Sequence, residues 1–219
     1  MLVKHRMTPN PITITPETKV PDAMHVVHEK KVNYLPVLDK KRKLVGIVSK
    51  TDLQQAGPSK ATTLSVFEAN YLLAHLEVRE IMNEPITVPE DAPLEEAARV
   101  MIENGIGCLP VMRDGELVGI ITETDIFKAF VEILGSGAAV LRITLRSPDV
   151  PGELARLTGV IARLGGNLHS VASFRSEDPQ HVYFTFRLDG VDEETLLPAL
   201  KELGEEVVNV YHLSPANSR

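Results

Sequence analysis

An internal repeat constrains the fold of this chain more than any other feature. Residues 11–24, PITITPETKVPDAM, match residues 85–98, PITVPEDAPLEEAA. Two more blocks recur in the same order: YLPV at 34–37 matches CLPV at 108–111, and LVGIVSKTDL at 44–53 matches LVGIITETDI at 117–126. Three matching blocks in one order mean that residues 11–126 hold the same structural unit twice.

Each copy predicts the same succession of elements. In the second copy, apolar residues at i, i+3, i+4, i+7 and i+8 predict one helix face, made of Leu94, Ala97, Ala98, Met101 and Ile102. Two short apolar runs separated by a charged turn follow, and a second helix starts at Thr51 or Thr124. The unit is therefore strand–helix–strand–strand–helix (β-α-β-β-α). One copy buries little apolar surface alone, so we expect the two to pack face to face.

The repeat also sets the domain boundaries. We assign residues 1–56 to the first copy and residues 78–134 to the second. Residues 57–77 form a linker, with a loop at 57–63 and a connector helix at 65–76.

A different module is predicted for residues 138–213, followed by a tail at 214–219. Apolar and polar residues alternate at 141–146 and 182–188, which indicates half-buried strands. A helical stripe is formed by Leu154, Leu157, Ile161 and Leu164, and the glycines at 165–166 end that helix with a left-handed cap. A second helix at 196–203 and further strands complete a β-α-β-β-α-β order, the ferredoxin-like arrangement. The whole chain is thus expected to be α+β.

Composition excludes several classes of protein. The formal net charge of −7 disfavours a nucleic-acid-binding face, which is basic. No run of about 18 apolar residues predicts a membrane span, and the first residues lack the apolar core of a signal peptide. The single cysteine, Cys108, excludes an internal disulfide and predicts an inert core thiol. A cytoplasmic protein is the expectation that follows.

These motifs resemble two known families. Both repeats resemble CBS domains, through the Leu-Pro-Val run and the Gly-φ-φ-[Ser/Thr]-x-x-Asp pattern at 46–52 and 119–125 (φ is an apolar residue), so the pair resembles a Bateman module. Residues 138–213 resemble an ACT domain, through DVPGEL at 149–154 and GGNL at 165–168. The layout is similar to acetoin-utilisation-protein-B-like CBS–ACT proteins, a name that implies little about biochemistry.

A hydroxyl followed three residues later by an acid, at a strand-to-helix turn, suits an adenosine ligand. The two pairs are Ser49 with Asp52 and Thr122 with Asp125. The acid can accept hydrogen bonds from both ribose hydroxyls, as acidic residues do in dinucleotide folds. The hydroxyl and the first helical N–H groups can hold a phosphate. The same spacing is also a capping box, which needs no ligand, and both interpretations stay open.

The CBS resemblance implies that the repeats share each ligand. In that family an adenosine ligand lies in a cleft between repeats, with the ribose acid from one and the adenine contacts from the other. One site would then be made of Thr13, Asn33, Tyr34, Leu35, Thr122 and Asp125. The other would be made of Thr87, Gly107, Cys108, Leu109, Ser49 and Asp52. Glu84 near one mouth would disfavour a triphosphate there unless Mg²⁺ intervened.

The ACT resemblance implies an amino-acid site. The helix N-terminus offers N–H groups to a carboxylate, and the amide at 167 would face it across the strand start. The candidate residues are Asp149, Pro151, Gly152, Leu154, Gly166, Asn167 and Leu168. Alternatively, Asp149 caps the helix, Pro151 suits an early helical position and Gly152 allows close packing, and the domain only dimerises.

Catalysis is not expected. The sequence holds no nucleophile–base pair, P-loop or Gly-x-Gly-x-x-Gly motif, and its seven histidines show no metal-ligand spacing. We therefore expect no metal and no catalytic cofactor.

A small-molecule sensor is the favoured function. Its regulatory ligand would be an adenosine nucleotide (AMP, ADP or ATP, or S-adenosylmethionine or NAD), and a small amino acid is a candidate second ligand. Homodimers or larger assemblies and a regulated protein of unknown identity are the expected partners, with no nucleic acid and no membrane. The alternative is a structural dimerisation module with vestigial pockets, although the intact Ser/Thr-x-x-Asp pattern in both repeats argues against it.

Overall fold

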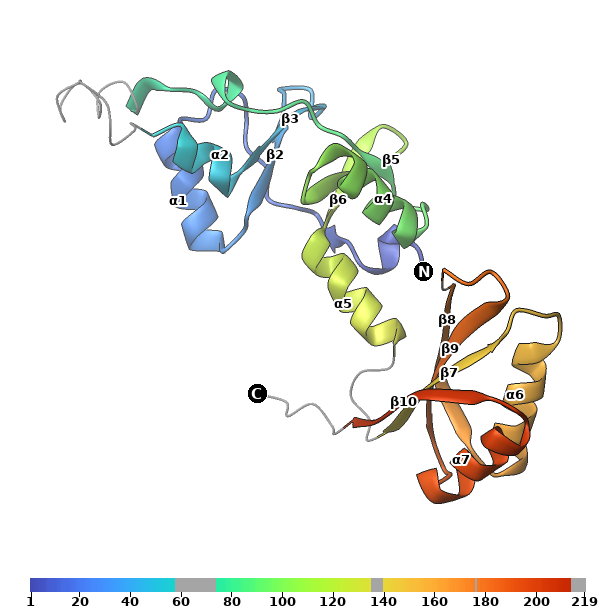
Figure 1. Cartoon of the computed structure of the whole chain (residues 1–219). Helices are drawn as coiled ribbons and strands as arrows, with labels where there is room; N and C mark the ends of the chain where they lie inside the picture. Colours follow the sequence, from blue (N-terminus) through green and yellow to red (C-terminus); the bar gives the residue numbers. More distant parts are fainter. Residues whose placement is uncertain (58–73, 135–139, 176, 214–219) are drawn as a thin grey trace. The chain divides into compact units, whose positions relative to one another are not determined.

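The computed structural model describes residues 1–57, 74–134, 140–175 and 177–213. They belong to two compact units, an N-terminal unit of Met1–Phe127 and a C-terminal unit of Lys128–Arg219 (Figure 1). Most of the loop expected at 57–63, most of the connector helix at 65–76, the helix break at 135–137 and the tail at 214–219 lie outside the described residues.

The first repeat is built on a two-stranded hairpin. After α1 (Val20–Lys30), strands β2 (Tyr34–Leu38) and β3 (Leu44–Ser49) pair antiparallel, and α2 (Lys50–Gln55) follows β3 directly. The helix α1 ends at Lys31, whose φ of 55° is left-handed. The core of this repeat is a cluster of buried apolar side chains from both helices and from the hairpin, among them Ala23, Val27, Leu35, Val37, Val48 and Leu53.

The second repeat has the same order, with a larger sheet. It contains β4 (Val88–Pro89), α4 (Leu94–Asn104), β5 (Cys108–Arg113), β6 (Glu116–Thr122) and α5 (Glu123–Ile133). The helix α4 buries Leu94, Ala97 and Met101, whereas Ile102 is 81% exposed. The predicted apolar face was therefore too wide, because only the i, i+3, i+7 row of α4 is buried.

The two repeats exchange the segments with which they begin. A 3₁₀ turn opens each repeat, η1 (Val3–His5) in the first and η2 (Val78–Glu80) in the second. The following strand β1 (Thr8–Pro9) pairs with β6 of the second repeat, which gives the sheet order β1-β6-β5-β4. Reciprocally, Asn83 bridges Ile47 of β3 through two backbone hydrogen bonds of 2.9 and 3.0 Å. Each hairpin is thus extended by backbone that belongs to the other repeat.

Two glycines make this exchange sterically possible. A Cβ added at Gly46 would overlap the Met82 sulfur and lie 2.9 Å from its Cγ. A Cβ added at Gly119 would overlap the Met7 sulfur and lie 3.0 Å from its Cγ. Because methionine from the incoming segment occupies this space, the glycine of each Gly-φ-φ-[Ser/Thr] motif is required by packing rather than by its backbone angles.

The C-terminal unit is a four-stranded antiparallel sheet with two helices on one face (Figure 1). Its elements run β7 (Val140–Pro148), α6 (Glu153–Arg163), β8 (Asn167–Arg175), β9 (His181–Asp189), α7 (Glu193–Glu202) and β10 (Glu206–Leu213), in the sheet order β10-β7-β9-β8. This confirms the predicted ferredoxin-like fold. On α6, Leu157 and Ile161 are fully buried in the core, whereas Leu154, which we placed in the same apolar stripe, is 41% exposed.

A buried ion cluster joins three elements of the C-terminal unit. The side chain of Glu205 has no exposed surface and accepts hydrogen bonds from Ser147 and Arg156. The same guanidinium pairs with Glu153, at the first position of α6. Burial raises the pKa of Glu205. Burial acts in the same direction on Glu153, but hydrogen bonds with Arg156 and Glu205 outweigh it and hold the pKa of that carboxyl below its usual value. One arginine therefore pairs with two buried acids and offsets the burial of Glu153 more fully than that of Glu205.

We predict that Gly119→Val destabilises the N-terminal unit by about 1–3 kcal/mol, the usual cost of overpacking. The new side chain would meet Met7 and, at 3.2 Å from its Cβ, the Thr8 carbonyl oxygen, which belongs to the backbone. Calorimetric melting is the measurement, and adding Met7→Ala should restore part of the loss. The control is Gly159→Ala in α6, where the nearest atom would be 3.8 Å away and no destabilisation is expected. An unchanged melting temperature for Gly119→Val would contradict the packing described above.

We predict that Arg156→Leu destabilises the C-terminal unit by about 3–5 kcal/mol, because it leaves buried carboxylates uncompensated. The matched control is Arg99→Leu in α4, which removes contacts with Glu96 and Glu103 on an exposed surface. Exposed pairs of this kind contribute about 0–1 kcal/mol. Equal losses in urea unfolding for the two variants would refute the assigned role of Arg156.

Candidate functional site

Two cavities of similar size lie in the N-terminal unit, where the two repeats meet. The first has a volume of about 420 Å³ and contains Ser49 and Asp52 in its lining. The second has a volume of about 390 Å³ and contains Thr122 and Asp125. Each cavity is therefore built on one copy of the hydroxyl–acid turn, and we name them the Ser49 cavity and the Thr122 cavity.

The hydroxyl–acid turn has the same geometry in both copies. The Asp52 Oδ2 accepts from the Ser49 backbone N–H at 2.7 Å and from its hydroxyl at 2.6 Å, and the Asp52 N–H donates to the hydroxyl oxygen at 3.1 Å. In the second copy the corresponding distances for Asp125 and Thr122 are 3.0, 2.7 and 3.3 Å. The capping-box interpretation is thus correct for the structure as it stands. Both carboxylates use only Oδ2 in these bonds.

Each cavity combines the turn of one repeat with residues of the other. The Ser49 cavity takes Ile86, Gly107 and Cys108 from the second repeat. The Thr122 cavity takes Ile12 from the segment before the first repeat's helix, and it takes Asn33 and Tyr34 from the start of β2. The structure therefore brings together these residues in the crossed arrangement that the sequence suggested.

Tyr34 and Gly107 form a wall between the two cavities, because both residues line both of them. A Cβ at position 107 would overlap the Tyr34 hydroxyl, so only glycine leaves room for the phenol. Burial raises the pKa of this phenol, and the neighbouring acids Glu123 and Asp52 raise it further. Tyr34 therefore keeps its proton at neutral pH and can act as a hydrogen-bond donor at the wall.

Some predicted residues lie elsewhere. Leu35 and Leu109 are completely buried and belong to the core, because alternate side chains of β2 and β5 face inward. Thr13 and Thr87 do not line either cavity, whereas the residues before them, Ile12 and Ile86, do. The alternation of the extended chain at these points turns the isoleucine, not the threonine, toward the cavity.

Sequence reasoning also missed residues that line the cavities. Ile12 and Ile86 are partly exposed, at 37% and 36%, and are matched positions of the repeat, which was the available signal. Their apolar surface at two equivalent mouths suits a flat, apolar ring. The other missed lining residues are Ile47, Lys50, Thr51, Asn83, Pro110, Thr8, Asn10, Pro11, Val32, Glu123 and Thr124, together with Gly105, Ile106 and Ile120.

The candidate amino-acid site is not assembled within one C-terminal unit. The segment from Asp149 to Leu154 stands at the start of α6, and the segment from Gly166 to Leu168 follows its end. The 11 residues of α6 separate the two by about 16 Å. Asn167 therefore does not face Asp149 across the strand start, as we had expected.

The local roles of these residues also differ from the capping interpretation. Gly152 itself is the N-cap of α6, with a φ of 88°, so Asp149 and Pro151 lie before the helix. The Asp149 carboxylate lies 3.6 Å from Arg175 instead. Gly166 is needed for packing, because a Cβ there would lie 2.7 Å from Ile161. Leu168 packs partly buried against the core.

Among the described residues, no helix is both long enough and apolar enough to cross a membrane.

Comparison with known families identifies the two modules. The CBS domain family matches residues 3–58 and 78–132, which together make up half of the chain, and the ACT domain family matches residues 141–206. Inosine-5'-monophosphate dehydrogenase from Aquifex aeolicus is 32% identical over 122 residues. That match covers 54% of this chain and 22% of the enzyme, and it lies in the CBS region, so the chain spans about a fifth of the enzyme's length. CBSX2 from Arabidopsis thaliana is 32% identical, with 58% of this chain and 62% of that protein covered.

Solved structures agree with the CBS assignment. The chain is similar to CBSX2 in complex with AMP, at 34% identity and a TM-score of 0.50, covering 60% of this chain and 97% of that one. It is similar to a putative acetoin utilization protein (AcuB) from Vibrio cholerae, at 32% identity and a TM-score of 0.50, covering 61% and 93%. It is also similar to the CBS domain pair of protein MJ0100 in complex with 5-methylthioadenosine and S-adenosyl-L-methionine, at 30% identity and a TM-score of 0.51, covering 60% and 97%.

The repeat, the exchanged hairpins and the family matches agree, and the chain belongs to the CBS-domain family, as a CBS pair followed by an ACT domain.

Proposed function

We propose that this chain is a non-enzymatic regulatory protein whose CBS pair binds adenosine ligands in the Ser49 and Thr122 cavities. The observation that carries the proposal is the repetition of one hydroxyl–acid turn, each copy opening onto a cavity of about 400 Å³. Pockets for small ligands are typically about 300–1,000 Å³. The relatives support it, since CBSX2 is described in complex with AMP and MJ0100 with two adenosine derivatives.

The ribose is assigned to the acid of each turn. Asp52 and Asp125 use Oδ2 for the capping box, and among the described residues Oδ1 has no hydrogen bond in either copy. A carboxylate oxygen can accept from a ribose hydroxyl without giving up the cap. The turn therefore holds itself in shape and presents one oxygen to the ligand.

The adenine is assigned to the other repeat. Ile86 beside the Ser49 cavity and Ile12 beside the Thr122 cavity offer apolar surface for one face of the base. Residues at the starts of β5 and β2 line the same cavities and bring backbone amides within reach of its polar edge. Because ribose and base contact different repeats, binding would stabilise the exchanged arrangement of the pair.

In this proposal the ACT domain promotes association between copies of the chain. Binding of an amino acid is the second role proposed for it. Since the two candidate segments are separated by α6, a site using both needs a second copy of the chain to bring the missing half. Amino-acid binding and dimerisation of this domain would then be linked. The cytoplasmic location stays a prediction from composition, and a structural dimerisation module remains the competing function.

We predict that Asp52→Ala and Asp125→Ala each weaken adenosine-ligand binding at their own cavity by about 1.5–3 kcal/mol, the range for hydrogen bonds to a charged group. Titration calorimetry with AMP, ADP, ATP, S-adenosylmethionine and NAD is the measurement. Both variants also lose a helix cap, so Asp192→Ala is the control, because Asp192 caps α7 through the Thr195 N–H at 2.7 Å in the other unit. Folded protein that gives no heat with any of these ligands would favour the dimerisation module instead.

We predict that the protein is at least a homodimer. Phe127, Phe130 and Ile133 on α5 are 67%, 58% and 52% exposed, and the edge strands of the ACT sheet are also open to pairing. Light scattering should therefore give a mass of at least twice 24.1 kDa. Replacing Phe127 and Phe130 with Ser should lower the assembly state or the dimer's stability. A 24.1 kDa species at all micromolar concentrations would refute the prediction.

A further inference from the structure

The two cavities differ in charge at one matched position. Lys50 follows Ser49, and Glu123 follows Thr122, so they occupy the same place in the repeat. Their backbones are equivalent in the structure too, since the Lys50 N–H donates to the Asn33 carbonyl at 2.8 Å and the Glu123 N–H to the Gly107 carbonyl at 3.0 Å. Lys50 lines the Ser49 cavity and Glu123 the Thr122 cavity.

Among the described residues, no other charged group of the lining cancels this difference. Besides the shared acid of the turn, the Ser49 cavity is lined by Lys50 and Glu84, whereas Glu123 is the other charged residue described in the lining of the Thr122 cavity. Arg79, which precedes the second repeat, lines neither cavity and pairs with Glu77 at 2.7 Å and Glu17 at 3.5 Å. Within the described part of the chain, neither Lys50 nor Glu123 has an ion-pair partner, so both charges are available to a ligand.

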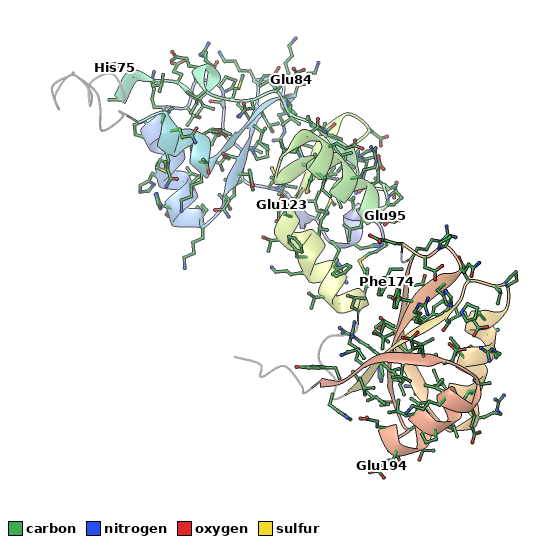
Figure 2. All side chains as sticks on the ribbon, in the orientation of Figure 1. His75, Glu84, Glu95, Glu123, Phe174 and Glu194 are labelled. Atoms are coloured by element: carbon green, nitrogen blue, oxygen red, sulfur yellow. The ribbon has the colours of Figure 1, made fainter. Side chains whose placement is uncertain are left out.

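Glu84 adds a second constraint on the Ser49 cavity. It is an exposed carboxylate in the lining, with no ion pair to Lys50 within 4.0 Å. Figure 2 shows Glu84 and Glu123 well apart on the N-terminal unit, each near the junction of the repeats. A single phosphate beside Lys50 gains a counter-charge, whereas each further phosphate adds negative charge to a cavity that is also lined by the Glu84 carboxylate.

We propose that the two cavities select different adenosine ligands by charge. The Ser49 cavity takes an adenosine nucleotide with a 5′-phosphate, and a monophosphate in preference to a triphosphate. The Thr122 cavity takes an adenosine derivative without phosphate, either neutral or cationic, such as a thioether or sulfonium nucleoside. This inference rests on the proposed function and assigns a ligand class to each of its two sites.

At equal backbone geometry, the two cavities differ in the sign of the charge at this position. A phosphate near Glu123 and Asp125 would meet two carboxylates and no cation, and like charges in a partly enclosed site repel more than they do in water. A sulfonium group in the same place gains from both carboxylates. Reversing one nearby charge is expected to change affinity by about tenfold, and the change should shrink with added salt.

The experiment uses the full chain with binding weakened at one cavity at a time. Asp125→Ala leaves the Ser49 cavity, and Asp52→Ala leaves the Thr122 cavity. Calorimetry of each with AMP, ATP, 5′-methylthioadenosine and S-adenosylmethionine should show AMP ahead of ATP in the first. The sulfonium and thioether nucleosides should be ahead of AMP in the second.

Charge exchange then tests the two named residues. In the Asp52→Ala background, Glu123→Lys should raise AMP affinity about tenfold and lower that of S-adenosylmethionine, and in the Asp125→Ala background Lys50→Glu should do the reverse. Glu116→Lys, at an exposed residue of β6 that lines neither cavity, makes the same change in net charge as Glu123→Lys and should alter neither affinity. Adenosine is the uncharged ligand whose affinity should stay constant throughout.

Chemical modification of the single cysteine can show which cavity holds a ligand. Cys108 lines the Ser49 cavity and does not line the Thr122 cavity, and burial raises the pKa of its thiol to about 12. Slow modification by a thiol reagent should be slowed further by AMP and left unchanged by S-adenosylmethionine.

Two results would overturn the inference in different ways. Binding of adenosine ligands with preferences that the exchanges at Lys50 and Glu123 do not alter would refute charge selection and leave the proposed function intact. Absence of binding by every adenosine ligand would refute the proposed function itself.

Discussion

The packing of a methionine against a glycine is the contact on which the N-terminal unit depends. Met82 on Gly46 and Met7 on Gly119 fix where each repeat's leading segment lies on the other repeat's hairpin. The backbone bridges at Ile47 and at Ile120 follow from that placement. The cavities follow as well, because the chain leaving each bridge carries the isoleucine that lines the mouth. The glycine that opens each Gly-φ-φ-[Ser/Thr]-x-x-Asp motif is thus required by the packing of a methionine, although in sequence it looks like part of a ligand-binding motif.

The hydroxyl–acid turn shows why a capping pattern and a binding pattern are hard to separate. One carboxylate oxygen of Asp52 closes the turn, and in the proposed function the other oxygen accepts from the ligand. The cap would then fix the carboxylate before the ligand arrives, which lowers the ordering cost of binding. Under this proposal the two interpretations of the sequence concern two atoms of one side chain, and the same holds for Asp125.

Much of the fold was predictable because the repeat and the alternating patterns report burial directly. The tandem β-α-β-β-α order and the ferredoxin-like order of the second module were confirmed. Errors occurred in predicting which residues of a helix face the core. Periodicity placed Ile102 and Leu154 in the core, whereas both are exposed in the structure. The segments flanking α6 were wrongly brought together although the helix between them was predicted, because the two ends of an 11-residue helix lie about 16 Å apart within one domain.

The cavities were less predictable than the fold, because their lining depends on contacts between repeats. Strand β1 spans two residues and its exchange leaves no periodic signal, so the exchange could not be predicted from the sequence, and the match of Ile12 to Ile86 was the only sign of the role of Ile12. The exchange also bears on ancestry. A chain with one repeat alone would complete its hairpin by borrowing the leading segment of an identical molecule. Duplication and fusion of such a gene would turn a two-chain assembly into one chain. The two copies could then diverge at single positions, as at Lys50 and Glu123, which a symmetric assembly forbids.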